Sequence, residues 1–337
     1  MSAKEPSVAG DSGARRVQEV AMGYYSSQAL YVAAKLGIAD LLDGGPQSAD
    51  GLAAAIGADA DALHRTLRLL AQEGIFSLDA EGRFSLNAAG AELKTGESGS
   101  MRDLVLVFGE EFYQAFGELL VAVKTGRDAF RITFGRGLFE YLEKYPDRGR
   151  AFDRAMGAGA VFFASVPAAY DFGSIATVVD VGGGNGTLLG SILAAHPHLR
   201  GILYDSGPVV ESARSNLHAL GVSDRVTAVA GNFFNEIAAG GDAYLFARIL
   251  HDWTDDQCLT ILSNCRRAIN PSGRVLVVER LLPGAYATAT DVNMLAVTGG
   301  RERSEEEFGR LMFETGFRLE RVMPLPLEYN LIEGVAV

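Results

Sequence analysis

Short apolar stretches alternate with helical stretches through the second half of the chain, and this alternation restricts the possible folds more than any other feature. Continuous apolar strands that are separated by helices form a parallel sheet, which helices cover on both faces. Five such strands are expected, at residues 177–181, 201–204, 225–230, 243–247 and 274–279. Helices are expected after Gly186, after Gly207, over 255–269 and over 304–315. The sequence therefore predicts a doubly wound α/β domain that ends in an antiparallel edge pair, formed by residues 317–323 and 329–335.

The first hundred residues have a different pattern, in which helices precede two short strands. A helix starts at Asp59, and residues 76–78 and 83–86 alternate in polarity around a turn at 79–82. This order is typical of a winged helix-turn-helix, which either reads DNA or serves as a scaffold that packs against another chain. Asp59 and Asp61 would repel phosphate at the start of the presumed recognition helix, and the chain has a formal net charge of −12. We therefore favour the scaffold and expect no nucleic-acid partner.

Residues 101–172 are predicted to be a helical, aromatic-rich connector between the two other parts of the chain, residues 1–100 and 173–337. Aromatic side chains at helical spacing are mostly core residues. A few side chains at the end of the connector are instead candidates for lining a flat aromatic pocket: Met156, Phe162 and Phe163.

Neither a membrane span nor a secretion signal is expected. The chain has no run of about 18 or more uncharged apolar residues, and residues 1–16 lack the apolar centre of a signal peptide. Cys258 and Cys265 lie in one predicted helix, where a rise of about 1.5 Å per residue places them too far apart for a disulfide. These features predict a reduced, cytoplasmic protein.

A glycine-rich turn follows the first predicted strand and is the strongest local motif of the chain. Residues 178–186 read Val-Val-Asp-Val-Gly-Gly-Gly-Asn-Gly. Glycines at the end of a buried strand let the backbone approach a nucleoside closely. The dinucleotide fingerprint needs a glycine where this chain has Thr187, and the Lys-Ser/Thr pair of a P-loop is missing after the turn.

Side chains at the ends of the next two strands could bind the ribose and the base of a nucleoside. Asp205 closes the second strand, where a carboxylate can accept hydrogen bonds from both ribose hydroxyls. The alternative for Asp205 is a cap on the helix that follows Gly207. The third strand ends at Gly231, Asn232 and Phe233, which suit an adenine through a polar edge and a stacked ring.

Over residues 20–337 the chain resembles the S-adenosylmethionine-dependent O-methyltransferases, which include plant caffeate and flavonoid enzymes and bacterial antibiotic-tailoring enzymes. Three motifs in matching order carry the resemblance: Val179 to Gly186, His251-Asp252-Trp253, and Thr298-Gly299-Gly300-Arg301-Glu302-Arg303-Ser304. The resemblance implies a doubly wound, Rossmann-like methyltransferase sheet behind an N-terminal all-α, winged-helix-like dimerisation domain. It also implies a homodimer that forms through the N-terminal domain.

The resemblance implies S-adenosyl-L-methionine as cofactor, with S-adenosyl-L-homocysteine as product. The implied contacts are Asp180, Gly182, Gly183 and Gly184 for the methionine end, Asp205 for the ribose, and Gly231, Asn232 and Phe233 for the adenine. Relatives usually have Asp where this chain has Asn232, whose amide oxygen can still accept from the adenine amino group. Arg248 is either a further cofactor contact or one partner of a surface ion pair.

His251 is the implied general base, because it follows the fourth strand directly at the carboxyl edge of the sheet, where open α/β folds bind ligands. Glu279 and Glu302 match the acidic pair that flanks the histidine in this family, and would orient the ring and stabilise its charged form. The alternatives are a solvated charge for Glu302 and an ordinary strand-end carboxylate for Glu279. Asp291, Asn293, Met294 and Leu295 match the family segment that lines the acceptor pocket, and Asp252, next to His251, is a further candidate for acceptor binding.

The implied acceptor is a small hydroxylated aromatic, in antibiotic or other secondary metabolism. A phenol has a pKa near 10 and an ordinary histidine a pKa near 6.5, so proton transfer is uphill by about 3.5 units unless the site changes these values. A phenolate shares its charge with ring carbons, so methylation at carbon, as on a hydroxykynurenine- or tyrosine-like precursor, is the alternative to methylation at oxygen. No metal is expected, because the ligand-rich residues lack zinc spacing.

Two rival functions come from other protein classes. A winged-helix regulator with a degenerate methyltransferase domain would bind DNA, but the intact His251 disfavours it. A nicotinamide-dependent dehydrogenase is disfavoured by Thr187.

Overall fold

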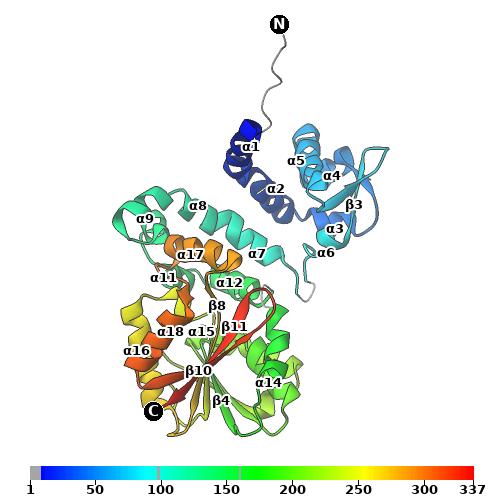
Figure 1. The fold of residues 1–337 in the computed structure, drawn as a ribbon. Coiled ribbons are helices and arrows are strands. Elements are labelled where there is room, and N and C mark those ends of the chain that lie inside the picture. Colours follow the sequence, from blue (N-terminus) through cyan, green and yellow to red (C-terminus); the bar gives the residue numbers. More distant parts are fainter. Residues whose placement is uncertain (1–8, 97–98, 159–160) are drawn as a thin grey trace. The chain divides into compact units, whose positions relative to one another are not determined.

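The computed structural model describes residues 9–96, 99–158 and 161–337, and divides into two compact units, Met1–Glu110 and Glu111–Val337 (Figure 1). The boundary between the units lies inside residues 101–172, which the sequence presents as a single connector. In the described part of the chain, no helix is both long enough and apolar enough to cross a membrane.

The N-terminal unit combines helices with a small sheet whose strand order is β1-β3-β2. Its elements are α1 (Ala9–Met22), α2 (Tyr24–Lys35), α3 (Ile38–Leu42), β1 (Gln47–Ser48), α4 (Ala49–Ile56), α5 (Ala60–Gln72), β2 (Phe76–Leu78), β3 (Arg83–Leu86), α6 (Ala88–Ala91) and α7 (Arg102–Val107). Asp59 caps α5, because its Oδ1 accepts a hydrogen bond from the Ala62 amide at 2.8 Å. Helices followed by an antiparallel wing are the arrangement that the sequence predicts.

A set of short helices opens the larger unit. They are α8 (Tyr113–Phe116), α9 (Leu119–Thr125), α10 (Ala129–Phe134), α11 (Leu138–Lys144), α12 (Pro146–Ala158) and α13 (Val166–Ala169), with a π-helical turn at Phe108–Phe112 and a 3-10 turn at Val161–Ser165. Of the aromatic side chains in this region, Phe112, Phe130, Phe162 and Phe163 are buried, whereas Tyr113, Phe116 and Phe139 are exposed and do not have the predicted core role. Phe130, for example, is fully buried and lies against Phe134 and Tyr141, with ring centroids 4.5 and 5.4 Å away.

A single large sheet organises the rest of this unit, with the strand order β10-β11-β8-β7-β4-β5-β6. Its strands are β4 (Thr177–Val181), β5 (Arg200–Asp205), β6 (Val226–Ala230), β7 (Ala243–Ala247), β8 (Arg274–Leu282), β10 (Phe317–Pro324) and β11 (Tyr329–Ala336). The strands from β8 to β6 are parallel, whereas β11 is antiparallel to both β8 and β10. The short strand β9 (Arg303–Ser304) adds to β8 in parallel. This is the predicted doubly wound sheet with its antiparallel edge pair.

Helices cover both faces of the sheet, as the continuous apolar strands require. Helices α13, α14 (Thr187–Ala195) and α15 (Gly207–Ala219) pack on one face, and α16 (Asp255–Ala268) and α18 (Glu305–Glu314) pack on the other. Cys258 and Cys265 are both buried free thiols of α16, which confirms their predicted packing role.

Two local differences from the predicted elements have clear physical reasons. The third strand starts at Val226, because Ser223–Arg225 form a 3-10 turn and Arg225 donates from its side chain to three backbone carbonyls of a neighbouring loop and helix. Residues Ala285–Val297, which the sequence leaves unassigned, form α17, which packs on α8, α9 and α10. Helix α17 lies near the carboxyl ends of the strands, beside α8 and α9 of the same unit (Figure 1).

Candidate active site

The glycine turn after β4 has the backbone conformation that only glycine adopts easily. Gly182, Gly184 and Gly186 have φ angles of 69°, 56° and 75°, in the left-handed region. A Cβ atom on Gly182 would lie 2.4 Å from Cδ1 of Ile249, which is closer than two carbon atoms can approach. Gly182 therefore has no room for a side chain, whereas a Cβ atom on Gly184 would meet nothing within 4 Å.

Carboxylates surround this turn. Oδ2 of Asp205 accepts a hydrogen bond from the Gly184 amide at 3.0 Å, and its Oδ1 accepts from the Ser206 amide at 2.7 Å. Ser206, not Asp205, occupies the N-cap position of α15, and the Asp205 side chain contacts the glycine turn instead. Oδ2 of Asp180 is buried without a hydrogen-bond partner in the described residues.

The negative charge of Asp205 affects the pKa values of two neighbouring carboxyl groups. Burial and then the charge of Asp205 raise the pKa of Asp180 to about 7. The same two causes raise the pKa of Asp153 on α12 to about 6. Asp153 was not found from the sequence, because nothing in the pattern of α12 distinguishes it from a solvated carboxylate. A cationic ligand would relieve the repulsion among the three groups, and the sulfonium and ammonium groups of S-adenosylmethionine fit this donor set.

The segment after β6 is held close to Asp205. The Gly231 amide donates to the Asp205 carbonyl at 2.9 Å, and a Cβ atom on Gly231 would lie 2.1 Å from the Tyr204 hydroxyl. Oδ1 of Asn232 accepts from the Phe234 amide at 2.9 Å, which fixes the side chain in the turn. The ring of Phe233 is half-buried. These residues lie beside the ribose-binding candidate, as the sequence predicts.

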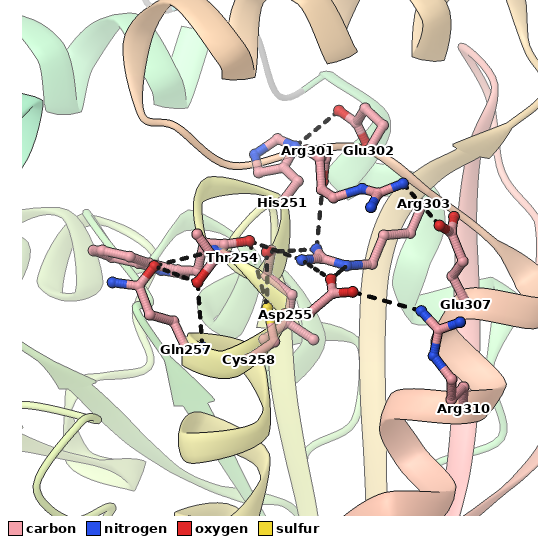
Figure 2. A network of polar contacts seen from close by, with 12 residues as sticks. His251, Thr254, Asp255, Gln257, Cys258, Arg301, Glu302, Arg303, Glu307 and Arg310 are labelled. Atoms are coloured by element: carbon pink, nitrogen blue, oxygen red, sulfur yellow. Dashed lines mark hydrogen bonds and ion pairs between the residues drawn. The ribbon is translucent and has the colours of Figure 1, made fainter. Parts of the chain in front are cut away.

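His251 lies in a one-turn 3-10 helix, Leu250–Asp252, which begins three residues after the end of β7 at Ala247, and only 8% of it is exposed. Its Nδ1 lies 2.9 Å from Oε1 of Glu302 (Figure 2). Its backbone amide donates to Oε1 of Glu279 at 3.0 Å. Glu279 is 0% exposed and Glu302 is 1% exposed. The solvated-charge alternative for Glu302 is therefore wrong, and Glu279 is more than a strand-end carboxylate.

The electrostatic surroundings make the His251 ring strongly basic. Burial lowers its pKa, but the charges of Glu279 and Asp252 and the hydrogen bond to Glu302 outweigh burial and raise the pKa to about 9. Burial raises the pKa of Glu279 to about 7 and that of Asp252 to about 6, although the His251 charge opposes both increases. The cluster thus stabilises an imidazolium at His251.

His251, Glu279 and Glu302 also form the described cluster that could hold a metal ion, with ligand atoms within 4.8 Å of one another. The 2.9 Å separation of Nδ1 and Oε1 is that of a hydrogen bond. Two ligands of one zinc ion, with bonds of about 2.0–2.1 Å at tetrahedral angles, would lie farther apart, at roughly 3.4 Å. The observed geometry is therefore that of a hydrogen-bonded histidine and carboxylate pair.

Arg248 lies between the base and the end of α12. Its Nη2 donates to the Met156 carbonyl at 2.7 Å, and its guanidinium lies 5.9 and 5.5 Å from the ring centroids of Phe162 and Phe163. Its φ angle is 57°, which is strained for a residue with a side chain. Within the described residues it has no ion pair, so the surface ion pair considered from the sequence is wrong.

The predicted acceptor residues divide between the core and the site. Phe162 is 1% exposed and stacks on Tyr329 at 3.5 Å between ring centroids, so its ring packs in the core. Phe163 is 9% exposed beside Arg248. The role predicted for Phe162 thus needs a correction: a ring already covered on one face has less surface for a ligand.

Helix α17 brings its residues to the same region. Oδ1 of Asp291 accepts from the Glu302 amide at 2.8 Å, so this side chain holds the loop that carries Glu302. The contact was missed from the sequence, which assigned Asp291 to the acceptor alone. Met294 is buried and Asn293 half-buried on the same helix. Asp252 lies next to the base, with Oδ1 3.9 Å from Nε2 of His251.

Comparisons with known proteins agree with this geometry. Residues 116–318 match the model of the O-methyltransferase domain, and residues 18–95 match that of the O-methyltransferase dimerisation domain. The second match confirms the scaffold interpretation of the N-terminal unit.

Similar proteins cover nearly the whole chain. Phenazine O-methyltransferase PhzM of Lysobacter antibioticus is 41% identical over 93% of both chains. The 3-amino-4-hydroxybenzoate 4-O-methyltransferase of Streptomyces cremeus is also 41% identical, over 96% of this chain and 90% of its own. The crystal structure of CalO1, a methyltransferase in calicheamicin biosynthesis, in its form bound to S-adenosylhomocysteine, has a TM-score of 0.83 and 36% identity, over 97% of this chain and 98% of that chain. This chain therefore belongs to the O-methyltransferase family and is an S-adenosylmethionine-dependent methyltransferase.

Proposed function

We propose that this enzyme methylates the hydroxyl group of a small aromatic acceptor, with His251 as the general base. The observation that carries the proposal is the orientation of the buried ring by the 2.9 Å hydrogen bond between Nδ1 and Glu302. A carboxylate only accepts, so Nδ1 carries the proton and Nε2 has the free electron pair. Nε2 is then the atom that takes the proton of the acceptor.

The raised pKa of His251 makes that proton transfer easier. With a pKa of about 9 for His251 and near 10 for a phenol, the transfer is uphill by about 1 unit, or ~1.4 kcal/mol. An ordinary histidine would face about 3.5 units, or ~5 kcal/mol. The charges of Glu279 and Asp252 and the hydrogen bond to Glu302 make this difference, because they stabilise the imidazolium that the transfer creates.

The bound cofactor supplies an activated methyl group on a positively charged sulfur, whose charge favours a nearby phenolate. The remaining task of the protein is alignment of the acceptor oxygen with that methyl group. We assign the methionine end of the cofactor to Asp180 and the turn 182–184, the ribose to Asp205, and the adenine to 231–233. Asp153 adds a carboxylate close to Asp205, because the charge of Asp205 contributes to its raised pKa.

Two similar enzymes are named for flat, ring-containing acceptors, a phenazine and an aminohydroxybenzoate. We propose that the acceptor here is a flat hydroxylated aromatic of an antibiotic pathway, with Phe163, Asn293 and Met294 beside it. Phe163 and Met294 keep some accessible surface, 9% and 7%, whereas Phe162 is only 1% exposed. Methylation of a ring carbon uses the same base and remains the second candidate.

The experiment is an assay of the purified protein with S-adenosylmethionine and a panel of phenols and hydroxylated aromatic amino acids. NMR of each product shows whether oxygen or carbon received the methyl group. Turnover of a phenol that is lost in His251→Ala supports the proposal. Turnover of amines alone, with phenols untouched, would contradict it.

We also propose that the protein acts as a homodimer in the cytoplasm, with the dimer formed by the N-terminal unit. The dimerisation-domain match supports this. Large apolar side chains of α1 and α2 are exposed in the single chain, with Val17 71%, Val20 66% and Tyr24 50% accessible. Surfaces of this kind usually mark an interface. The two free thiols fit a reducing compartment.

A further inference from the structure

We infer that Arg303 is a positioning residue of the reaction, whose buried guanidinium fixes the loop that carries His251. The inference rests on the proposed role of His251 as the base. Arg303 is 1% exposed and is among the largest fully buried side chains of the described chain. Burial of a guanidinium destabilises the fold unless its N–H donors have hydrogen-bond partners. The partners of Arg303 therefore indicate its structural role.

Those contacts lie on both sides of the base. Nη1 of Arg303 donates to the Leu250 carbonyl at 2.9 Å, and Nη2 donates to the Trp253 carbonyl at 2.8 Å (Figure 2). Leu250 precedes His251 directly, and Trp253 follows it by two residues. One rigid planar group therefore holds both ends of the short 3-10 turn that presents the imidazole ring.

A carboxylate fixes the guanidinium in turn. Nε and Nη2 of Arg303 lie 2.9 and 2.8 Å from Oδ1 of Asp255, the first residue of α16. Charge-assisted bonds of this kind are stronger than neutral ones. The Arg303 backbone is anchored as well, because β9 pairs with β8 at Leu281. The loop with His251 is thus tied to α16 and to the sheet through one side chain.

The neighbouring residues of the same loop act on the ring and its backbone. The side chain of Glu302 bonds to Nδ1 of His251, and the Arg301 amide donates to the His251 carbonyl at 2.8 Å. A Cβ atom on Gly300 would lie 2.0 Å from that carbonyl, so the two loops are in close contact. Glu302 can orient the ring only while the turn keeps its position, and Arg303 supplies that restraint.

Lysine is the informative substitution, because it keeps the positive charge but cannot reach two carbonyls and a carboxylate at once. In Arg303→Lys we expect kcat to fall by about 10²-fold, the loss that a displacement of about 1 Å can cause. The affinity for S-adenosylhomocysteine, measured by calorimetry, should stay within about threefold, because Arg303 has no contact with the glycine turn.

Arg310→Met is the matched control. Arg310 also contacts Asp255, but from the exposed surface and at 3.5 Å to Oδ2. We expect kcat of this variant within about twofold of the unaltered enzyme, since no bond to the His251 turn is lost.

A titration of His251 by NMR separates positioning from a general loss of stability. The ring should titrate near 9 in the unaltered protein and in Arg310→Met, and clearly lower in Arg303→Lys, because a displaced ring loses its bond to Glu302. Lysine has the same positive charge as arginine. A lower pKa of His251 in Arg303→Lys therefore reports displacement of the ring and not the loss of a charge.

The outcomes distinguish this inference from the proposed function. An unchanged His251 titration and normal kcat in a folded Arg303→Lys would overturn the positioning role and leave the base in place. Normal turnover in His251→Ala would instead remove the base, whatever the titration shows.

A second variant keeps the inference testable if Arg303→Lys does not fold. Asp255→Asn retains the shape of the side chain that fixes the guanidinium but removes its charge, so Arg303 is held less firmly. We expect the His251 titration to move below 9 and kcat to fall in this variant as well, by less than in Arg303→Lys. An unchanged titration together with normal kcat in Asp255→Asn would overturn the positioning role.

Discussion

Nδ1 of His251 lies 2.9 Å from Oε1 of Glu302, although 51 residues separate the two in the chain. Both groups are almost completely buried, and the backbone amide of His251 bonds to a second buried carboxylate, Glu279. A neutral histidine in an apolar core would lose basicity through burial. Here the carboxylates reverse that effect, and the proposed chemistry of the site depends on this reversal.

Removal of the base should abolish turnover without loss of the cofactor. In His251→Ala we expect the turnover of phenols to fall by about 10²-fold or more, the usual contribution of a general base. Calorimetry with S-adenosylhomocysteine should give an unchanged affinity. His218→Ala, an exposed histidine on α15, is the control and should behave as the unaltered enzyme. Comparable activity of the two variants would refute the assignment.

Removal of the charge beside the ring should lower the basicity of His251. Glu302→Gln keeps the shape and a hydrogen-bond acceptor but removes the negative charge, so the pKa of His251 should fall below about 9. We expect kcat to fall by about 10-fold or more, because the imidazolium is less stable. Glu306→Gln, at an exposed position in the first turn of α18, is the control. An equal His251 titration in both variants, followed by NMR, would contradict the proposed coupling.

The pH dependence should follow from the direction of the same shift. His251 is protonated below its raised pKa of about 9, so kcat/KM for a phenol should rise with pH up to about 9. Below that pH, kcat/KM should increase almost tenfold for each pH unit, because the enzyme and the acceptor together must lose one proton. Initial rates between pH 6 and 10 in constant ionic strength test this. A plateau that begins near the ordinary histidine pKa of about 6.5 would show that the pKa of His251 is not raised in solution.

A side chain in the glycine turn should weaken cofactor binding. Gly182→Ala places a methyl group 2.4 Å from Ile249 at a φ of 69°, so the turn must shift. We expect the Kd for S-adenosylhomocysteine to rise by about 10-fold or more, together with a loss of stability of about 1–2 kcal/mol from the left-handed backbone. Gly207→Ala, where a Cβ atom meets nothing within 4 Å, is the control. Equal affinities would place the cofactor elsewhere.

The oligomeric state can be tested on the exposed face of α1. Light scattering should give a mass of two chains of 35.8 kDa each. The double variant Val17→Glu with Val20→Glu puts charges on that face and should shift the protein toward the monomer, because desolvating a charge in an apolar interface is costly. Phe313→Glu, at a residue 79% exposed on α18, should leave the mass unchanged. A monomeric mass for the unaltered protein at micromolar concentration would reject the dimer.

Several features of this protein could be read from the order of its residues. The alternation of apolar strands and helices predicted the parallel sheet and its edge pair, because the spacing of apolar residues differs between helices and strands. The glycines of the turn were recognisable, since a left-handed backbone restricts the residue type at its own position. His251 was recognisable because it follows a strand closely at the carboxyl edge. Helix α17 was missed, because its even distribution of apolar residues produces no clear amphipathic period.

The amino-acid sequence by itself determined the strands and most of the helices of the α/β domain, the glycine turn and the identity of the proposed base. Only the tertiary structure decided that Glu279 and Glu302 are buried against His251, that Asp291 holds the Glu302 amide, and that Arg303 binds both ends of the His251 turn. The physical reason is that burial and pairing depend on which distant segments pack together. A carboxylate in an acidic run looks the same in the sequence whether water or an imidazole ring surrounds it, and only the folded chain separates the two.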